Sequence, residues 1–211
     1  MLEQVSLFTD LPAEEILRLE ALCRERTVPK NTLVINEGDE TDCLYIVRKG
    51  RASALRSDEA GRQFVVNRFG PGDTFGEISL FDSNARSASV VSNTRCTLMV
   101  MPRKSFFEFA TRYPDIYRNM IRTLLAKLRR ATDQIGELAF LDVYGRLVRF
   151  LIENQTADGV IEEKLTHQEL AAIVGSSRET VCRIVNQLVD GGYLSRERGR
   201  MCIRKKLPYH F

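Results

Sequence analysis

The chain carries the stretch Phe75-Gly76-Glu77-Ile78-Ser79-Leu80-Phe81, followed by Ala85-Arg86-Ser87-Ala88. Gly76 would let the backbone approach a ligand closely. Glu77 is an acceptor that suits a sugar hydroxyl, and Arg86 is a planar cation that suits a phosphodiester. Ser87 adds a hydroxyl group, and a helical turn over residues 78–81 would direct its N–H groups toward the same anion. These residues predict a nucleotide site, and the alternative is a salt bridge between Glu77 and Arg86.

Short runs rich in Val, Ile, Leu, Thr, Phe and Tyr surround this stretch. They cover residues 32–35, 43–47, 63–69, 87–91 and 96–101, and turn-forming residues such as Gly70-Pro71-Gly72-Asp73 separate them. Many short strands at near-regular spacing predict a β-sandwich or barrel-like domain. A helix is predicted before it, over Leu7 to Arg26, and a short helix after it, over Lys104 to Thr111.

Pro114 opens a long helical run from Asp115 to Leu141. At about 1.5 Å per residue this helix would be roughly 40 Å long, which is more than a small domain needs. Its apolar residues at steps of three, four or seven are Ile116, Met120, Leu124, Leu128, Ile135 and Leu138. We expect this stripe to pair with a second copy of the chain. Burial within one chain is the alternative.

Residues 142–211 predict short helices followed by a hairpin. The helices cover residues 143–154, 168–174 and 178–190, and the strands cover 193–194 and 201–203. Thr166 and Glu169 have the spacing of a capping box, Gly175 breaks the chain, and Ser176 or Ser177 would cap the next helix. Two helices joined by a glycine-containing turn form a helix-turn-helix, whose second helix enters the DNA major groove.

The second of these helices has one polar face and one apolar face. Arg178, Glu179 and Arg183 share the polar face, and the apolar face carries Val181, Ile184, Val185 and Leu188. A guanidinium can bind guanine, and a carboxylate can accept from the amino group of cytosine. Between Ser176 and Lys206 the charge is 8 − 3 = +5, against +3 for the whole chain. We therefore predict that this helix recognises DNA bases and that the basic hairpin contacts DNA phosphates. The alternative is a helical bundle whose arginine-rich face is simply solvated.

Other classes of protein fit the sequence poorly. The five cysteines are scattered, and both histidines, His167 and His210, lie in the last quarter. This predicts no disulfide framework, metal, haem or iron–sulfur cluster. No apolar run approaches the roughly 20 residues of a membrane span, and the N-terminus does not resemble a secretory signal, so the expected location is cytoplasmic without membrane attachment. Catalysis would need a metal cluster or a nucleophile–base pair beside Glu77, so we expect no enzyme; a nucleotide-processing enzyme such as a phosphodiesterase is the remote alternative.

Three motifs resemble those of bacterial transcription regulators of the catabolite activator protein (CRP/FNR) family. They are residues 75–81 with 85–89, Gly136-Glu137-Leu138-Ala139-Phe140-Leu141-Asp142-Val143, and Gly175-Ser176-Ser177-Arg178-Glu179-Thr180-Val181-Cys182-Arg183. The resemblance covers essentially the whole chain and implies an α+β fold. Its expected parts are a cyclic-nucleotide-binding β-roll (a double-stranded β-helix or jelly roll) over 1–113, a long dimerisation helix and hinge over 114–141, and a winged helix-turn-helix over 142–211.

The resemblance also implies roles for individual residues. The ligand-binding set is Gly76, Glu77, Ile78, Ser79, Arg86, Ser87, Ala88 and Thr132. The DNA-binding set is Thr166, His167, Gln168, Ser177, Arg178, Glu179, Thr180, Arg183 and Arg200, reading a TGTGA-like half-site in an inverted repeat. Phe140, Leu141 and Asp142 are the expected hinge.

The ligand that the resemblance implies first is cyclic AMP. Ala131 stands where members that respond to cyclic AMP carry the first of two hydroxyl residues, so cyclic GMP and cyclic di-GMP stay open. The implied partners are double-stranded DNA, a second copy of the chain and RNA polymerase, and activation is the expected mode. A regulator with a vestigial pocket, which binds DNA without any nucleotide, is the second reading.

Overall fold

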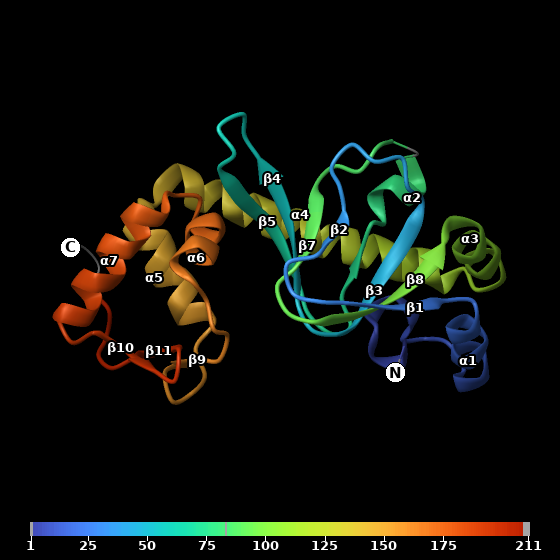
Figure 1. The fold of residues 1–211 in the computed structure, drawn as a ribbon. Helices are drawn as coiled ribbons and strands as arrows, with labels where there is room; N and C mark the ends of the chain where they lie inside the picture. The colour runs from blue at the N-terminus through green and yellow to red at the C-terminus, as the bar shows by residue number, and fades with distance from the viewer. Residues whose placement is uncertain (1, 83, 209–211) are drawn as a thin grey trace. The chain divides into compact units, whose positions relative to one another are not determined.

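The computed structural model describes residues 2–82 and 84–208. The chain forms two compact units. One comprises Met1–Arg56 with Val66–Arg130, and the other comprises Ser57–Val65 with Ala131–Phe211 (Figure 1). No helix in the described part of the chain is long and apolar enough to cross a membrane.

The first unit is built on two four-stranded antiparallel sheets, which agrees with the predicted β domain. One sheet has the order β1 (Arg24–Val28), β8 (Cys96–Pro102), β3 (Cys43–Lys49), β6 (Thr74–Phe75). The other has the order β2 (Leu33–Ile35), β7 (Ser89–Ser92), β4 (Ala52–Ser57), β5 (Gln63–Phe69). The strands β1, β4 and β6 were not among the predicted strands. Side chains of both sheets, including Val47, Leu98, Val90 and Phe69, share one buried core. The short helix α2 (Ile78–Asp82) follows β6 and confirms the predicted helical turn.

The opposite face of the first sheet packs against helices. Leu44, Ile46 and Met99 share a buried cluster with side chains of the 3-10 helices η1 (Leu2–Gln4) and η2 (Ser6–Phe8) and of the α-helices α1 (Ala13–Ala21), α3 (Arg103–Arg112) and α4 (Asp115–Phe140). The predicted helix over Leu7 to Arg26 is wrong in extent. Residues 24–28 instead pair with β8 along their whole length, because backbone pairing within a sheet outweighs local helix preference.

The apolar stripe predicted on the long helix divides into two parts. Ile116 and Met120 are buried in the cluster just described, and Leu124 is partly buried against it. These three residues therefore follow the alternative of burial within one chain. The exposed apolar face of α4 instead consists of Ile121 (58%), Leu125 (49%), Leu128 (63%), Ile135 (67%) and Leu138 (45%). A single stripe could not distinguish the two faces, because the helix begins inside a domain core.

The second unit holds three helices and a three-stranded sheet. The helices are α5 (Val143–Glu153), α6 (His167–Val174) and α7 (Arg178–Asp190), and the sheet has the order β10 (Leu194–Glu197), β11 (Arg200–Ile203), β9 (Val160–Ile161). Its core includes Leu147, Leu170, Val181 and Leu188. The strands of the predicted hairpin are longer than expected, and Arg198 and Gly199 join them with φ of 50° and 81°. Two successive residues with positive φ are typical of a tight hairpin turn.

The predicted caps of α6 and α7 are confirmed, whereas Pro12, and not Thr9 or Asp10, stands at the N-cap of α1. Thr166 accepts a hydrogen bond from the Glu169 N–H, and the Glu169 carboxylate accepts from the Thr166 N–H, which completes the capping box. Ser177 caps α7 by accepting from the Thr180 N–H. Gly175 ends α6 with a φ of 64°, in the left-handed region where glycine costs least. These caps fix the turn that presents α7.

Candidate ligand-binding and DNA-binding sites

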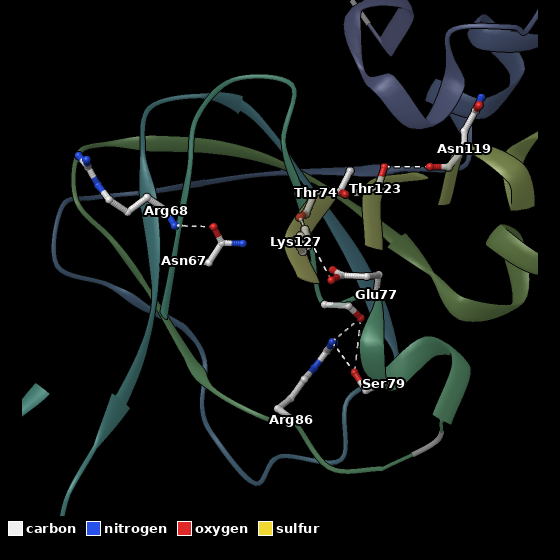
Figure 2. A network of polar contacts seen from close by, with 10 residues as sticks. Asn67, Arg68, Thr74, Glu77, Ser79, Arg86, Asn119, Thr123 and Lys127 are labelled. Carbon is white, nitrogen blue, oxygen red and sulfur yellow. Dashed lines mark hydrogen bonds and ion pairs between the residues drawn. The ribbon is translucent and has the colours of Figure 1, made fainter. Parts of the chain in front are cut away.

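Arg86 is buried, and neutral groups hold its guanidinium. Its Nε donates to the Thr41 hydroxyl at 2.9 Å, and Nη2 donates to the Cys43 carbonyl at 2.8 Å. Nη1 donates to the Gly76 carbonyl at 2.7 Å and to the Ser79 hydroxyl at 2.6 Å (Figure 2). These hydrogen bonds occupy four of the five N–H groups of the guanidinium. A buried cation surrounded by neutral acceptors keeps its full charge for an anion.

Burial also acts on the ionisation of the groups around Arg86. It lowers the pKa of Arg86, because a low-dielectric environment disfavours the charged form, although the side chain stays protonated at any physiological pH. Burial raises the pKa of Tyr45, whose ring lies 5.8 Å from the guanidinium carbon of Arg86. Tyr45 in turn stacks on Phe75 at 5.0 Å between ring centroids. The cation therefore lies beside an aromatic ring, and the nearby carboxylates of Glu77 and Asp42 act on it electrostatically without a direct ion pair among the described residues.

Gly76 is needed for this arrangement, for a reason that the sequence did not give. Its φ is +84°, and a Cβ atom there would lie 2.5 Å from Arg86 Nη1 and 2.8 Å from the Cys43 carbonyl oxygen. The sequence suggested that Gly76 admits a ligand to the backbone. The structure shows that it admits the arginine side chain.

Glu77 pairs with Lys127 of α4, and this partner was missed by the sequence reasoning. The Lys127 ammonium lies 2.9 Å from Glu77 Oε1 and also donates to the Thr74 carbonyl at 2.8 Å (Figure 2). Arg86 is held by its four neutral acceptors and Glu77 by this lysine, so the alternative of a Glu77–Arg86 salt bridge is wrong. The glutamate side chain is 4% exposed, so its charge is balanced within the fold. No sequence pattern links positions 50 residues apart.

The other predicted ligand-binding residues have varied environments. Ser79 is buried and bonded to Arg86, whereas Ile78 is 49% exposed. Ser87 is exposed, and Ala88 packs against the core between the sheets. Thr132 lies on an exposed part of α4 in the second unit. The structure therefore brings Gly76, Glu77, Ser79 and Arg86 together in the first unit.

Helix α7 has the two faces that the sequence predicted. Arg178, Glu179 and Arg183 are exposed, while Val181, Ile184, Val185 and Leu188 are buried in the core of the second unit. Hydrogen bonds from its own backbone N–H and from the Ser177 hydroxyl lower the pKa of Glu179. Glu179 is therefore a charged acceptor at neutral pH, as a contact to a cytosine amino group would require.

The residues predicted to contact phosphates surround this helix. Thr166, Gln168 and Ser177 are exposed at the starts of α6 and α7, and Thr180 is partly exposed. Arg200 is exposed at the start of β11. His167 is partly buried, and its Nε2 contacts the Arg196 guanidinium of β10. The Thr166 and Ser177 hydroxyl oxygens already accept hydrogen bonds from backbone N–H groups in the two caps.

The predicted hinge lies between two helices. α4 ends at Phe140, which is 88% exposed, and Asp142 caps α5 by accepting from the Gly145 N–H at 2.7 Å. Arg146 donates to the Leu141 carbonyl at 2.6 Å and to the Val174 carbonyl at 2.7 Å. Arg146 thus ties the hinge to the end of α6, a contact that the sequence reasoning missed because its acceptors are backbone atoms.

Two family models match the chain. Residues 25–113 match the cyclic nucleotide-binding domain, and residues 145–206 match the Crp-like helix-turn-helix domain. The first range contains Gly76, Glu77 and Arg86, and the second contains α6, α7 and the hairpin of β10 and β11. Each match therefore falls on one of the two sites described above.

Similar proteins are transcription regulators. The cAMP-activated global transcriptional regulator CRP of Salmonella typhimurium is 32% identical over 82% of this chain and 86% of its own length. The cAMP-activated regulator Vfr of Pseudomonas aeruginosa is 32% identical over 83% and 86%. Among solved structures, the c-di-GMP responsive regulator CLP of Xanthomonas campestris has a TM-score of 0.82 and 28% identity, covering 92% of this chain and all of that one. The catabolite activator protein of Thermus thermophilus has a TM-score of 0.58 and 29% identity, covering 94% and 93%. The chain therefore belongs to the CRP/FNR family of DNA-binding transcription regulators, which are not enzymes.

Proposed function

We propose that this chain is a dimeric regulator whose affinity for a TGTGA-like inverted repeat is set by a cyclic nucleotide bound at Arg86 and Glu77. Cyclic AMP is the first candidate ligand. The observation that carries the proposal is the buried guanidinium of Arg86, which is held by four neutral acceptors. Removing a charge from water is costly unless a counter-charge follows it, so such a cation favours an anionic ligand.

The number of buried cations favours a mononucleotide. Among the described residues, Arg86 is the one Arg or Lys that is buried. One guanidinium matches the single negative charge of a cyclic mononucleotide phosphodiester, whereas cyclic di-GMP has two such charges. The two cAMP-activated relatives support the same choice. Cyclic di-GMP stays the second candidate, because the c-di-GMP responsive regulator of Xanthomonas campestris has a closely similar structure.

Glu77 and Lys127 supply a route from the ligand to the long helix. The described ion pair uses Oε1 of Glu77, and a sugar hydroxyl could donate to the same carboxylate. A ligand bound there changes the hydrogen bonding of a group that already holds α4. A ligand shifts a conformational equilibrium only when it binds one state more tightly, and this contact would give it a differential affinity.

The exposed face of α4 supports pairing of two chains. Ile121, Leu125, Leu128 and Ile135 are each at least 49% exposed. Their spacing of four, three and seven residues is that of a coiled-coil seam, on which Thr132 would also fall. In a symmetric dimer, two copies of α7 would read half-sites about one DNA turn apart. Phe140, Leu141 and Asp142 would be the hinge that sets this spacing, and RNA polymerase is the expected further partner.

Calorimetric titration tests the proposal. The purified protein is titrated with cyclic AMP, cyclic GMP and cyclic di-GMP, each with and without a duplex carrying a TGTGA-type palindrome. We expect one nucleotide to bind and to tighten DNA binding, and we expect Arg86→Ala to abolish nucleotide binding. Arg48→Ala, at an exposed arginine on β3, is the matched control and should bind as wild type does. DNA binding that no nucleotide changes would instead identify a regulator with a vestigial pocket.

A further inference from the structure

Three elements of the second unit bring basic groups together. His167 is the first residue of α6, Arg178 the first residue of α7, and Arg196 lies in β10. The Arg196 guanidinium contacts His167 Nε2. Burial lowers the pKa of His167 first, and the charges of Arg196 and Arg178 lower it further. The imidazole is therefore neutral at physiological pH and can accept the hydrogen bond from Arg196.

The partner of Arg196 differs in kind from that of its neighbour in the same hairpin. Arg204 pairs with the carboxylate of Glu197, which cancels its charge. Among the ion pairs within residues 2–82 and 84–208, none joins Arg178 or Arg196 to a carboxylate. A neutral imidazole orients a guanidinium without neutralising it. Arg196 thus keeps its full charge and the N–H groups that His167 does not use.

We propose that Arg196 is a DNA-phosphate contact and that His167 is its positioning residue. The proposal rests on DNA binding through α7, as argued above. A guanidinium presents its N–H groups in a planar fork that matches two phosphate oxygens, so its orientation matters more than that of a lysine ammonium. The contact to His167 fixes that orientation beside Arg178, at the start of the helix that reads the bases. The hairpin strand and α6 would then hold one phosphate between them.

Salt dependence of DNA affinity tests the assignment. Each neutralised phosphate contributes about 0.9 to the slope of log K against log salt. Arg196→Ala should therefore lower the slope by about 2 for a dimer on a palindrome, and by the same amount on a scrambled duplex of equal length. Arg204→Ala is the control, because its charge is already paired, and it should change the slope by much less.

Variants of His167 separate positioning from direct contact. We expect His167→Ala, like Arg196→Ala, to lower the affinity for DNA. The double variant should bind no more weakly than Arg196→Ala alone, because His167 acts through Arg196. His167→Gln keeps an uncharged acceptor and should recover most of the DNA affinity that His167→Ala loses. If His167→Gln loses as much affinity as His167→Ala, the positioning role is wrong.

The controls distinguish this inference from the function on which it rests. An unchanged salt slope in Arg196→Ala, while wild type binds the duplex, overturns the phosphate contact alone. A wild-type chain that binds neither duplex overturns DNA binding and this inference together. Circular dichroism melting of each variant checks that the second unit is folded.

Discussion

Replacing Gly76 by alanine should weaken the proposed ligand site without replacing any side chain that we assign to ligand binding. The new Cβ would lie 2.5 Å from Arg86 Nη1, a separation that real Cβ atoms essentially never show. It would also meet the Cys43 carbonyl oxygen at 2.8 Å. Because the Cys43 carbonyl belongs to the backbone and Arg86 Nη1 to a side chain, we expect the guanidinium to shift.

The expected cost has two parts. A non-glycine residue in the left-handed region costs about 1–2 kcal/mol. A displaced guanidinium also loses its hydrogen bonds to the Gly76 carbonyl and to the Ser79 hydroxyl, which have a charged donor and are worth about 1.5–3 kcal/mol each. The free energy of unfolding should therefore fall by about 4–8 kcal/mol. Loss of one such bond to the ligand should lower nucleotide affinity roughly 10- to 150-fold.

Gly61→Ala supplies the matched control. Gly61 has a φ of +75°, and nothing lies within 4 Å of the Cβ position there. This variant carries the backbone cost without the collision. Urea denaturation gives the change in stability of both variants, and calorimetry with cyclic AMP gives the change in affinity. If Gly76→Ala is destabilised no more than Gly61→Ala and binds nucleotide as wild type does, the reasoning about Arg86 is refuted.

Four further outcomes are expected. Lys127→Met should lower the free energy of unfolding by about 1–3 kcal/mol in urea denaturation, because it removes the charged donor of a buried carboxylate; an unchanged midpoint would contradict this. Leu128→Glu should sediment as a monomer, while Leu17→Glu, at an equally exposed leucine of α1, should sediment as wild type does. Glu179→Ala should relax preference at one base position by roughly 1–3 kcal/mol in selection from randomised half-sites, and an equal loss on every sequence would argue against base reading. Stability of the second unit should be greatest above about pH 6.5 and should fall as the pH drops through the folded-state pKa of His167, because the unfolded chain binds the proton more readily; thermal melts of wild type and His167→Gln check this.

Features that depend on nearby residues could be predicted from the sequence. The capping box of Thr166 and Glu169, the cap at Ser177 and the left-handed Gly175 are confirmed, because each is decided within three residues or fewer. The bounds of α7 are confirmed as well, since its apolar period and both of its ends are local. The strand β1 was missed for the opposite reason. Its residues carry no apolar alternation, and only the pairing with β8 makes them a strand.

In the candidate ligand site, too, local features could be predicted from the sequence and long-range contacts could not. Gly76, Glu77 and Arg86 could be named from the sequence because they lie within eleven positions of one another and have the chemistry of a nucleotide site. The roles that they have toward one another could not be named. Thr41 and Cys43, two acceptors of Arg86, come from a segment more than 40 residues away, and Lys127 comes from a helix 50 residues beyond Glu77. His167 and Arg196 show the same limit at the other site, since 29 positions separate them. In both sites, residue type predicts which group meets the ligand, and only the fold shows which neighbour holds that group in place and whether the neighbour cancels its charge.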